Sequence, residues 1–274
     1  MKKYSVITIL TLSLCIIMFG RYHYSQKLLD ITVNAQERVH ISDNTRLEGT
    51  DEKKDGGQSN ASNLNERLHG VNNELAEVIK TRLSANDTVS IIAFGSQALI
   101  DSQDEGIVPW PIRLEEKLND AYDTDLFSVE TISLGKTTSL EMIQEGRHDE
   151  LAEERADIYL IEPLIWNDNG QVSIDHSTEH LSMLMDSILS YNDEAVVFVM
   201  PSQPAYNTVN YPKQIAGLGE FAEAHDIFYH NHWEDFPSLT DDNLLKYVDK
   251  DDHRMPTEKG HDLWSDSVLR IFIP

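Results

Sequence analysis

The sequence predicts an α/β domain in which helices cover both faces of a parallel sheet. Short apolar runs rich in β-branched residues recur from residue 89 onward, and each has the length of a buried strand. Longer stretches of helix-forming character separate these runs. Such alternation is typical of a doubly wound sheet, because parallel neighbours need a crossover connection.

The expected elements follow one another in a regular order. Strands are expected at 89–94, 127–134, 157–162, 195–200 and, from a weaker pattern, 227–230. Helices are expected at 110–122, 138–154, 178–191, 211–225 and 256–273, the last with Pro256 and Thr257 at its start. Ligands of such sheets bind at the carboxyl ends of the strands. A site is therefore expected in loops 95–109, 135–138, 163–177 and 201–210 and in the segment before the last helix.

The N-terminal part differs from this pattern. Residues 4–20 are apolar and uncharged and follow Lys2 and Lys3, which predicts an uncleaved signal anchor within residues 1–23. Residues 24–65 are expected to be a flexible polar linker, since 41–65 contain almost no large apolar residue. The remaining 66–274 are expected to form the domain, on the extracytoplasmic side of the cell membrane as a single-pass protein. Cys15 is the only cysteine, so neither an intramolecular disulfide nor a cysteine zinc site is possible.

The charge of the chain is strongly negative. The formal net charge is -25, and residues 66–274 carry 40 Asp and Glu against 14 Lys and Arg. A field of this sign repels nucleic acid, so nucleic-acid binding is excluded as a function. The charge has two interpretations, a solvated surface that tolerates salt or alkali and an acidic groove for a cationic substrate.

Polar or small residues follow the first three expected strands. Ser96 places a hydroxyl after the first strand, where the small Gly95 is expected to keep it accessible. Gly135 follows the second strand and can offer its N–H, and Asn167 follows the third and can donate its amide to an oxyanion. Each also has a purely structural interpretation: Ser96 as a helix N-cap, Gly135 as a strand-ending turn, and 167–170 as a turn.

With an acid and histidine cluster before the last helix, these residues have the block order of SGNH (GDSL-type) hydrolases, which the chain resembles over about residues 86–273. More narrowly, it resembles Bacillus-type membrane-anchored members in segments 95–96, 162–170, 211–214 and 256–261. The resemblance implies a three-layer α/β/α sandwich and the hydrolysis or transfer of an acyl ester. It assigns the nucleophile to Ser96 and the oxyanion contacts to the N–H groups of Ser96 and Gly135 and the side chain of Asn167.

The chain departs from the family pattern in its first and third blocks. Gly95 stands where the first block usually has Asp, in the order Gly-Asp-Ser. Ile165 stands where a glycine usually precedes the third-block asparagine by two positions.

The last block departs further. The family places Asp three residues before the catalytic histidine and Pro directly after it, whereas residues 249–256 read Asp-Lys-Asp-Asp-His-Arg-Met-Pro. A lengthened loop would make His253 the base, oriented by Asp252 or by a neighbouring Asp, and Asp252 and His253 are the predicted pair. The alternatives are His261 as the base, or no functional histidine. In the last case the domain would be a non-catalytic envelope-binding or scaffold domain with a degenerate pocket.

The other histidines show no spacing typical of metal ligands. His230 and His232 could share a face at the end of a strand, but a lone pair is a weak signal. The sequence therefore predicts neither a metal nor a cofactor. The expected partners are an acyl-ester substrate, small molecule or glycan, on a cell-envelope or extracellular molecule, and the membrane through the N-terminal anchor.

Overall fold

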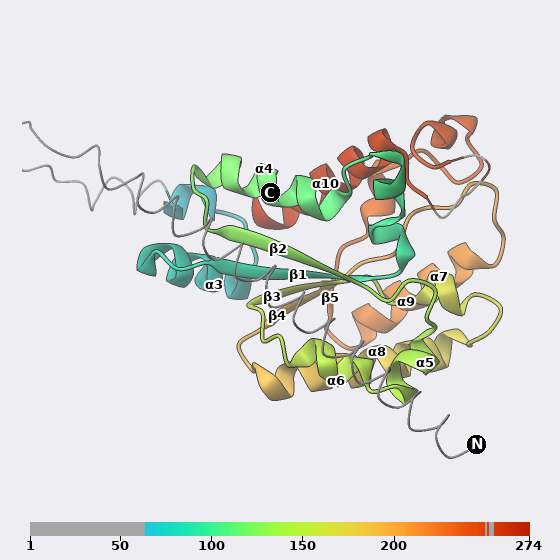
Figure 1. Ribbon diagram of the computed structural model, residues 1–274, viewed down its shortest axis with the longest axis horizontal. Helices are drawn as coiled ribbons and strands as arrows, with labels where there is room; N and C mark the ends of the chain where they lie inside the picture. The colour runs from blue at the N-terminus through green and yellow to red at the C-terminus, as the bar shows by residue number, and fades with distance from the viewer. Residues whose placement is uncertain (1–63, 250, 252–254) are drawn as a thin grey trace, which may run out of the picture. The chain divides into compact units, whose positions relative to one another are not determined.

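The computed structural model describes residues 64–249, 251 and 255–274 (Figure 1). The predicted anchor and most of the predicted linker lie outside these residues, as do Asp252 and His253. Residues 64–67 are already helical, so ordered structure begins slightly before the expected boundary at 66. Within the described ranges, no helix has the length and apolar character needed to cross a membrane.

A five-stranded parallel sheet forms the centre of the domain. Its strands are β1 (Val89–Gly95), β2 (Phe127–Ser133), β3 (Ile158–Ile161), β4 (Val196–Val199) and β5 (Phe228–Tyr229). The order across the sheet is β2-β1-β3-β4-β5, and each neighbouring pair is parallel. The strands match the predicted positions to within one or two residues at each end. Strands buried on both faces are continuous apolar runs, so the limits of each run mark the limits of the strand.

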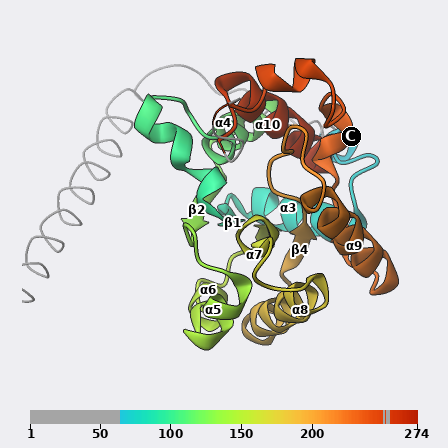
Figure 2. The same ribbon diagram turned by 90° about the vertical axis from the view of Figure 1, so that its right-hand side faces the viewer.

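Helices cover both faces of the sheet (Figures 1 and 2). On one face lie α3 (Asn73–Ala85), α4 (Trp110–Tyr122) and α10 (Glu258–Phe272), and on the other lie α5 (Ser139–Gln144), α6 (Arg147–Ala152), α8 (Ile174–Tyr191) and α9 (Tyr211–Ala224). Alternate residues of β1 serve the two cores: Ile91 and Ala93 pack with the first group, and Ile92 and Phe94 with the second. The predicted doubly wound α/β/α sandwich is confirmed.

The helices differ from the prediction in three places. Helix α3 was not predicted, and α8 begins at Ile174 rather than at 178. The expected single helix over 138–154 is wrong, since Gly146 adopts φ 71° between α5 and α6. This left-handed conformation ends one helix and starts the next at no steric cost to glycine. Short helical turns fill the loops: η2 (Gln97–Leu99), η3 (Asp101–Glu105), α7 (Ile165–Asp168), η4 (His232–Asp235) and η5 (Asp242–Lys246).

The strand order determines where a site can form. From β1 the chain crosses to β2 on one side, and from β2 it returns to β3 on the other side of β1. The loops after β1 and β3 therefore diverge, and the crevice at such a reversal is the usual ligand position in open α/β sheets.

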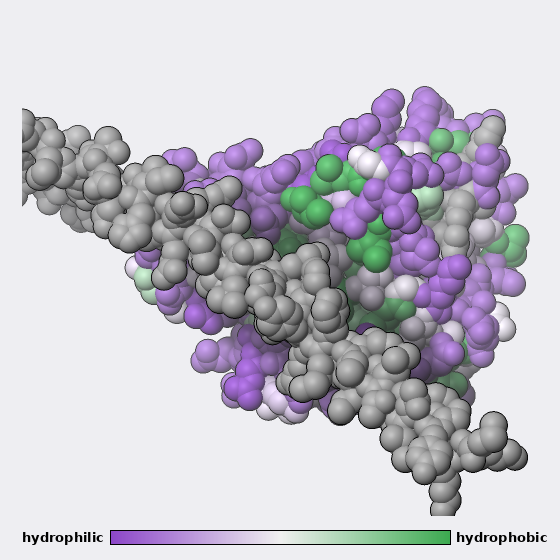
Figure 3. Space-filling view, in the orientation of Figure 1, coloured by the Kyte–Doolittle hydropathy of each residue, from purple (hydrophilic) through white to green (hydrophobic). Residues whose placement is uncertain are grey.

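The face drawn in Figure 3 is mostly hydrophilic, with apolar side chains gathered in small patches.

Candidate active site

Ser96 directly follows β1 at the carboxyl edge of the sheet. Its Oγ accepts the N–H of Ala98 at 3.2 Å, so Ser96 is the N-cap of η2. The N-cap interpretation is therefore correct, and the Ser96 side chain also has a hydrogen bond with the carboxyl of Glu162. Only 1% of the Ser96 surface is exposed, so the expectation that Gly95 keeps the serine accessible is wrong.

Hydrogen bonds join the loops after the first three strands. The carbonyl oxygen of Gly135 accepts the N–H of Gln97 at 2.9 Å and the Nδ2 of Asn167 at 3.0 Å. Ser133 donates its hydroxyl to the carbonyl of Ser96 at 2.8 Å. The loops that carry Ser96, Gly135 and Asn167 thus lie against one another at the carboxyl edge, since all three segments meet around one carbonyl group.

The donors expected to bind an oxyanion all have acceptors within the protein. The N–H of Ser96 donates to Oε2 of Glu162 at 3.2 Å, and the N–H of Gly135 donates to Oγ of Ser133 at 3.1 Å. Asn167, which lies in α7 rather than in a turn, donates Nδ2 to the carbonyls of Gly135 and Thr137. An oxyanion would have to take these donors from their present partners.

Glu162 is a buried carboxylic acid beside Ser96. It follows β3 and is 1% exposed. Burial raises the pKa of Glu162 to about 7, while hydrogen bonds from Ser96 and Ser202 oppose that rise. Its Oε1 has no partner with hydrogen-bond geometry among the described residues. Sequence reasoning included Glu162 only within a family block, although a carboxylate directly after a fully apolar strand could have singled it out.

Aromatic and polar side chains enclose Glu162 on the β4 side. Ser202 and Gln203 follow β4, are at most 1% exposed and contact each other. Tyr211 at the start of α9 is fully buried, and burial followed by the charge of Glu162 raises its pKa well above the ordinary value. Its ring packs edge-on against Trp166 at a centroid distance of 4.8 Å. The Tyr-Pro-Lys-Gln segment thus contributes a wall of the crevice rather than a reactive group.

Asp168, which follows Asn167, braces the helices near the site. Its Oδ1 accepts the N–H of Ser139 at 2.8 Å, and its Oδ2 accepts the hydroxyl of Ser177 at 2.6 Å. Ser139 Oγ in turn contacts Nδ1 of His180 at 2.8 Å. Since Asp168 is fully buried and spans α5, α7 and α8, its role is to hold the loop of Asn167 in place.

The segment that carries the predicted base is anchored at both ends. Val248 and Pro256 form an antiparallel bridge, and the N–H of Asp249 donates to the carbonyl of Met255 at 3.0 Å. The predicted Asp252 and His253 lie between these ends, outside the described residues. The assignment of the acid and the base therefore stays a prediction.

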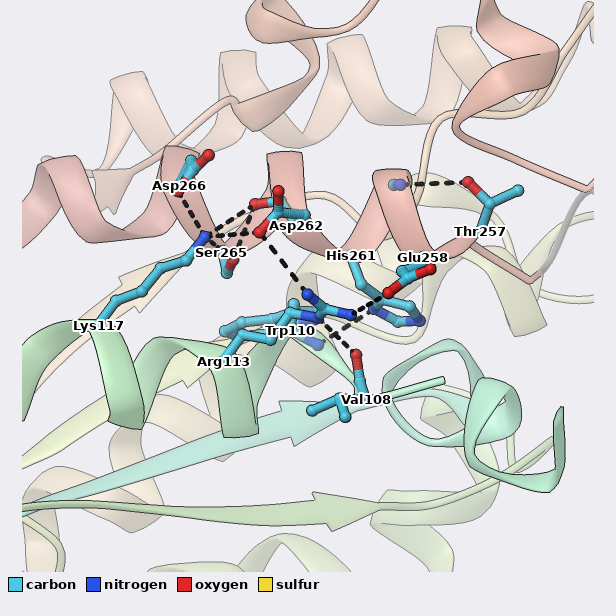
Figure 4. A network of polar contacts seen from close by, with 11 residues as sticks. Val108, Trp110, Arg113, Lys117, Thr257, Glu258, His261, Asp262, Ser265 and Asp266 are labelled. Carbon is cyan, nitrogen blue, oxygen red and sulfur yellow. Dashed lines mark hydrogen bonds and ion pairs between the residues drawn. The ribbon is translucent and has the colours of Figure 1, made fainter. Parts of the chain in front are cut away.

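His261, the alternative base, is buried between two helices. Figure 4 shows its ring directed from α10 to the start of α4, where Nδ1 accepts the N–H of Trp110 at 3.1 Å. Burial lowers the pKa of His261 to about 3, and none of its surface is exposed. Further along α10, the carboxylates of Asp262 and Asp266 pair with Lys117 of α4 at 2.9 and 2.5 Å. His261 is thus a structural contact of the helix pair.

The rings of His230 and His232 contact different groups and do not form a common site. Nε2 of His230 contacts Oγ of Ser267 at 2.9 Å, whereas the buried ring of His232 stacks on Trp264 at 4.3 Å. Over residues 64–249, 251 and 255–274, no group of three or more His, Cys, Asp or Glu side chains is placed to hold a metal ion.

An acidic hollow lies at the other edge of the sheet. Its lining includes Glu74, Glu77, Asp157 and Glu194, and its volume is about 440 Å³. Asp157 and Glu194 precede β3 and β4, so the hollow is at the amino edge, away from Ser96. Asp157 is paired there with Arg82 at 2.6 Å. This hollow is therefore not part of the serine site.

Comparisons with known proteins identify the fold. No family model matches the chain, and no curated protein sequence matches it. Among solved structures, a lipolytic protein of the G-D-S-L family from Desulfitobacterium hafniense is 15% identical, with a TM-score of 0.50 over 67% of this chain and 99% of the other. The esterase EstA from Pseudoalteromonas is 19% identical, with a TM-score of 0.51 over 66% and 95%. A lipase/acylhydrolase from Enterococcus faecalis is 16% identical, with a TM-score of 0.52 over 66% and 93%. The domain shares the fold of these three proteins.

Proposed function

We propose that the domain is a serine hydrolase of the SGNH (GDSL) type, an esterase or acyl transferase with Ser96 as its nucleophile. The observation that carries the proposal is the position of Ser96 at the reversal between β1 and β3. The loops of Gly135 and Asn167 are hydrogen-bonded beside it. The esterases and lipases that share the fold support the reaction class by analogy.

The proposed reaction needs one nucleophile, one base and the oxyanion donors. Oγ of Ser96 attacks the carbonyl carbon of the ester while His253, oriented by Asp252, takes the hydroxyl proton. The negative oxygen of the tetrahedral intermediate is held by the N–H groups of Ser96 and Gly135 and by Nδ2 of Asn167. The intermediate collapses, the C–O bond breaks, and the alcohol leaves with the proton from His253. Water or an acceptor hydroxyl then removes the acyl group from Ser96.

The substrate class rests on the sequence of the N-terminal part. The predicted anchor at 1–23 and the predicted linker at 24–65 support a domain that is tethered to the membrane on its extracytoplasmic side. An acylated cell-envelope or extracellular molecule, such as an O-acetylated glycan, is the substrate that fits this location. The membrane-anchored subtype belongs to the same proposal.

Turnover of p-nitrophenyl acetate by the full chain tests the function. We expect a steady rate that Ser96→Ala and His253→Ala each reduce by at least about a thousandfold, since one removes the proposed nucleophile and the other the proposed base. Ser102→Ala is the matched control, because Ser102 is a fully buried serine in the same loop. The proposal fails if Ser96→Ala and Ser102→Ala have the same rate as the unmodified protein between pH 6 and 10.

A second candidate function is a non-catalytic envelope-binding or scaffold domain. The observation that favours it is that all three expected oxyanion donors are occupied and Ser96 is buried. A serine that no ester can reach would leave only the shape of the crevice for binding. The absence of any Ser96-dependent rate in the same assay would support this function.

A further inference from the structure

Gly95 and Glu162 share a single volume between β1 and β3. A Cβ atom on Gly95 would lie 2.6 Å from Oε2 and 2.7 Å from Cβ of Glu162, which is closer than such atoms approach in proteins. The φ of Gly95 is not in the left-handed region, so its backbone would accept another residue. Glycine is therefore required at 95 for steric reasons, because the side chain of Glu162 occupies the space that a Cβ atom would need.

Glu162 uses this room to reach the nucleophile. Its Oε2 accepts the N–H of Ser96 at 3.2 Å. The carboxyl is 1% exposed and is enclosed by Ser202 and Tyr211 on the side of β4 and α9. Because the carboxyl is buried, no solvent competes for its hydrogen bonds with Ser96, which therefore stay in a fixed place.

The position of this carboxyl coincides with a departure in the sequence. The first block of the resembled family has an acid between its glycine and its serine, and here Gly95 stands in that slot. We propose that Glu162 supplies the missing acid in space, reaching from the end of β3 into the volume beside residue 95 and positioning Ser96 through its main-chain N–H. Glu162 is thus a positioning residue that belongs to the nucleophile block although it comes from another strand.

Two consequences follow, of which only the second rests on the proposed function. Residues 95 and 162 are coupled, so residue 95 tolerates a side chain only when the side chain of residue 162 is removed. In the proposed reaction, loss of Glu162 disturbs the orientation of Ser96, which lowers kcat more than it raises KM.

The first experiment measures the coupling without reference to activity. The urea midpoint of the full chain is compared for Gly95→Ala, Glu162→Gly and the double variant, because Glu162→Gly also removes the Cβ that blocks residue 95. We expect Gly95→Ala to lower the midpoint strongly in the unmodified protein and to leave it nearly unchanged in the Glu162→Gly background. If Gly95→Ala does not fold but the double variant does, this outcome also supports the coupling. Equal shifts in both backgrounds would overturn the inference.

A matched control uses a glycine with ordinary room. A Cβ on Gly219 would lie 3.4 Å from the ring of Tyr229, within normal contact. Gly219→Ala is therefore expected to shift the midpoint equally with and without Glu162→Gly.

The second experiment exchanges the two residues. With p-nitrophenyl acetate, Glu162→Gly is expected to lower the Ser96-dependent kcat by up to about a hundredfold, as small misplacements of reacting groups do. The exchange variant Gly95→Asp/Glu162→Gly is expected to recover at least about tenfold of this loss, since an acid is again present beside Ser96. An exchange variant no faster than Glu162→Gly would overturn the positioning role. If the unmodified protein has no Ser96-dependent rate, the proposed function fails, and the urea experiment alone decides whether Glu162 occupies the place of residue 95.

Discussion

At the scale of single residues, burial reverses the usual contribution of a carboxylate to stability. The pKa of Glu162 is raised from 4.5 to about 7, and burial is the largest cause. Between these values the folded protein holds a proton that the unfolded chain has released, so stability falls as the pH rises from about 4.5 to 7. Above pH 7 the buried charge costs about 3 kcal/mol, since each tenfold change in a proton-binding constant corresponds to about 1.4 kcal/mol.

Glu162→Gln is therefore expected to stabilise the protein at alkaline pH. The amide keeps an oxygen for the N–H of Ser96 and carries no charge to bury. We expect the variant to be about as stable as the unmodified protein at pH 5 and more stable by up to about 3 kcal/mol at pH 8. Urea unfolding of both proteins at the two pH values measures the difference.

An exposed glutamate provides the control for this measurement. Glu116 lies on the solvent side of α4, and Glu116→Gln should change stability by the same small amount at pH 5 and pH 8. A Glu162→Gln difference that is also independent of pH would show that the carboxyl ionises in the folded protein as it does in water.

At the scale of elements, the contact between α10 and the segment before it depends on one glycine. Gly260 lies in the first turn of α10, and a Cβ there would be 2.0 Å from the carbonyl oxygen of Tyr247. That oxygen accepts the N–H of Thr257, so it cannot move away without breaking the helix start. The same turn carries His261 to Trp110, which links α10 to α4. The glycine of Glu-Lys-Gly-His is therefore required for packing.

Gly260→Ala is expected to destabilise the protein although alanine favours helices. The clash with a fixed carbonyl should cost about 1–3 kcal/mol or more, which exceeds the gain of up to about 1 kcal/mol from helix propensity. Gly219→Ala in α9, where a Cβ has ordinary room, should show the propensity gain alone. Urea midpoints of the two variants are expected to shift in opposite directions. A shift of both toward higher urea would contradict the close contact of Gly260 with Tyr247.

At the scale of the whole molecule, negative charge is the dominant surface property. The chain has 47 Asp and Glu and only 22 Lys and Arg, and the imbalance is concentrated in residues 66–274. Self-repulsion of a net charge of -25 opposes the compact state. The acidic hollow at the amino edge is separate from the serine site, so it does not by itself supply an acidic groove for a substrate there.

Screening of this repulsion should raise thermal stability. We expect Tm to rise as NaCl is added, with most of the rise below about 0.2 M, because the Debye length is already about 8 Å at 0.15 M. Calorimetry between 0.02 and about 1 M NaCl measures the dependence. A Tm that falls with salt would mean that attractive ion pairs, such as those of Lys117 with Asp262 and Asp266, outweigh the net repulsion.

The sequence alone determined the sheet and most of its covering helices. β-Branched apolar runs such as 89–94 encode buried parallel strands, and the limits of α4 agree with the predicted 110–122 because its helical stretch begins at Trp110 and Pro111. Helix α3 was missed because only Leu75 and Ile79 are fully buried on it, which leaves a weak periodic signal. The break at Gly146 was missed because the flanking residues favour one continuous helix.

Only the tertiary structure decided what surrounds Ser96. The order of glycine, serine and asparagine blocks along the chain placed Ser96, Gly135 and Asn167 at one sheet edge, since carboxyl ends of parallel strands share an edge. The pairing of Ser96 with Glu162 joins residues 66 positions apart, and no local pattern encodes it. Whether residue 95 must be glycine depends on how closely β1 and β3 approach at their ends, a distance that packing of the whole sheet determines. For the same reason, the burial of His261 against Trp110 follows from the docking of α10 on α4 and not from its place in the sequence.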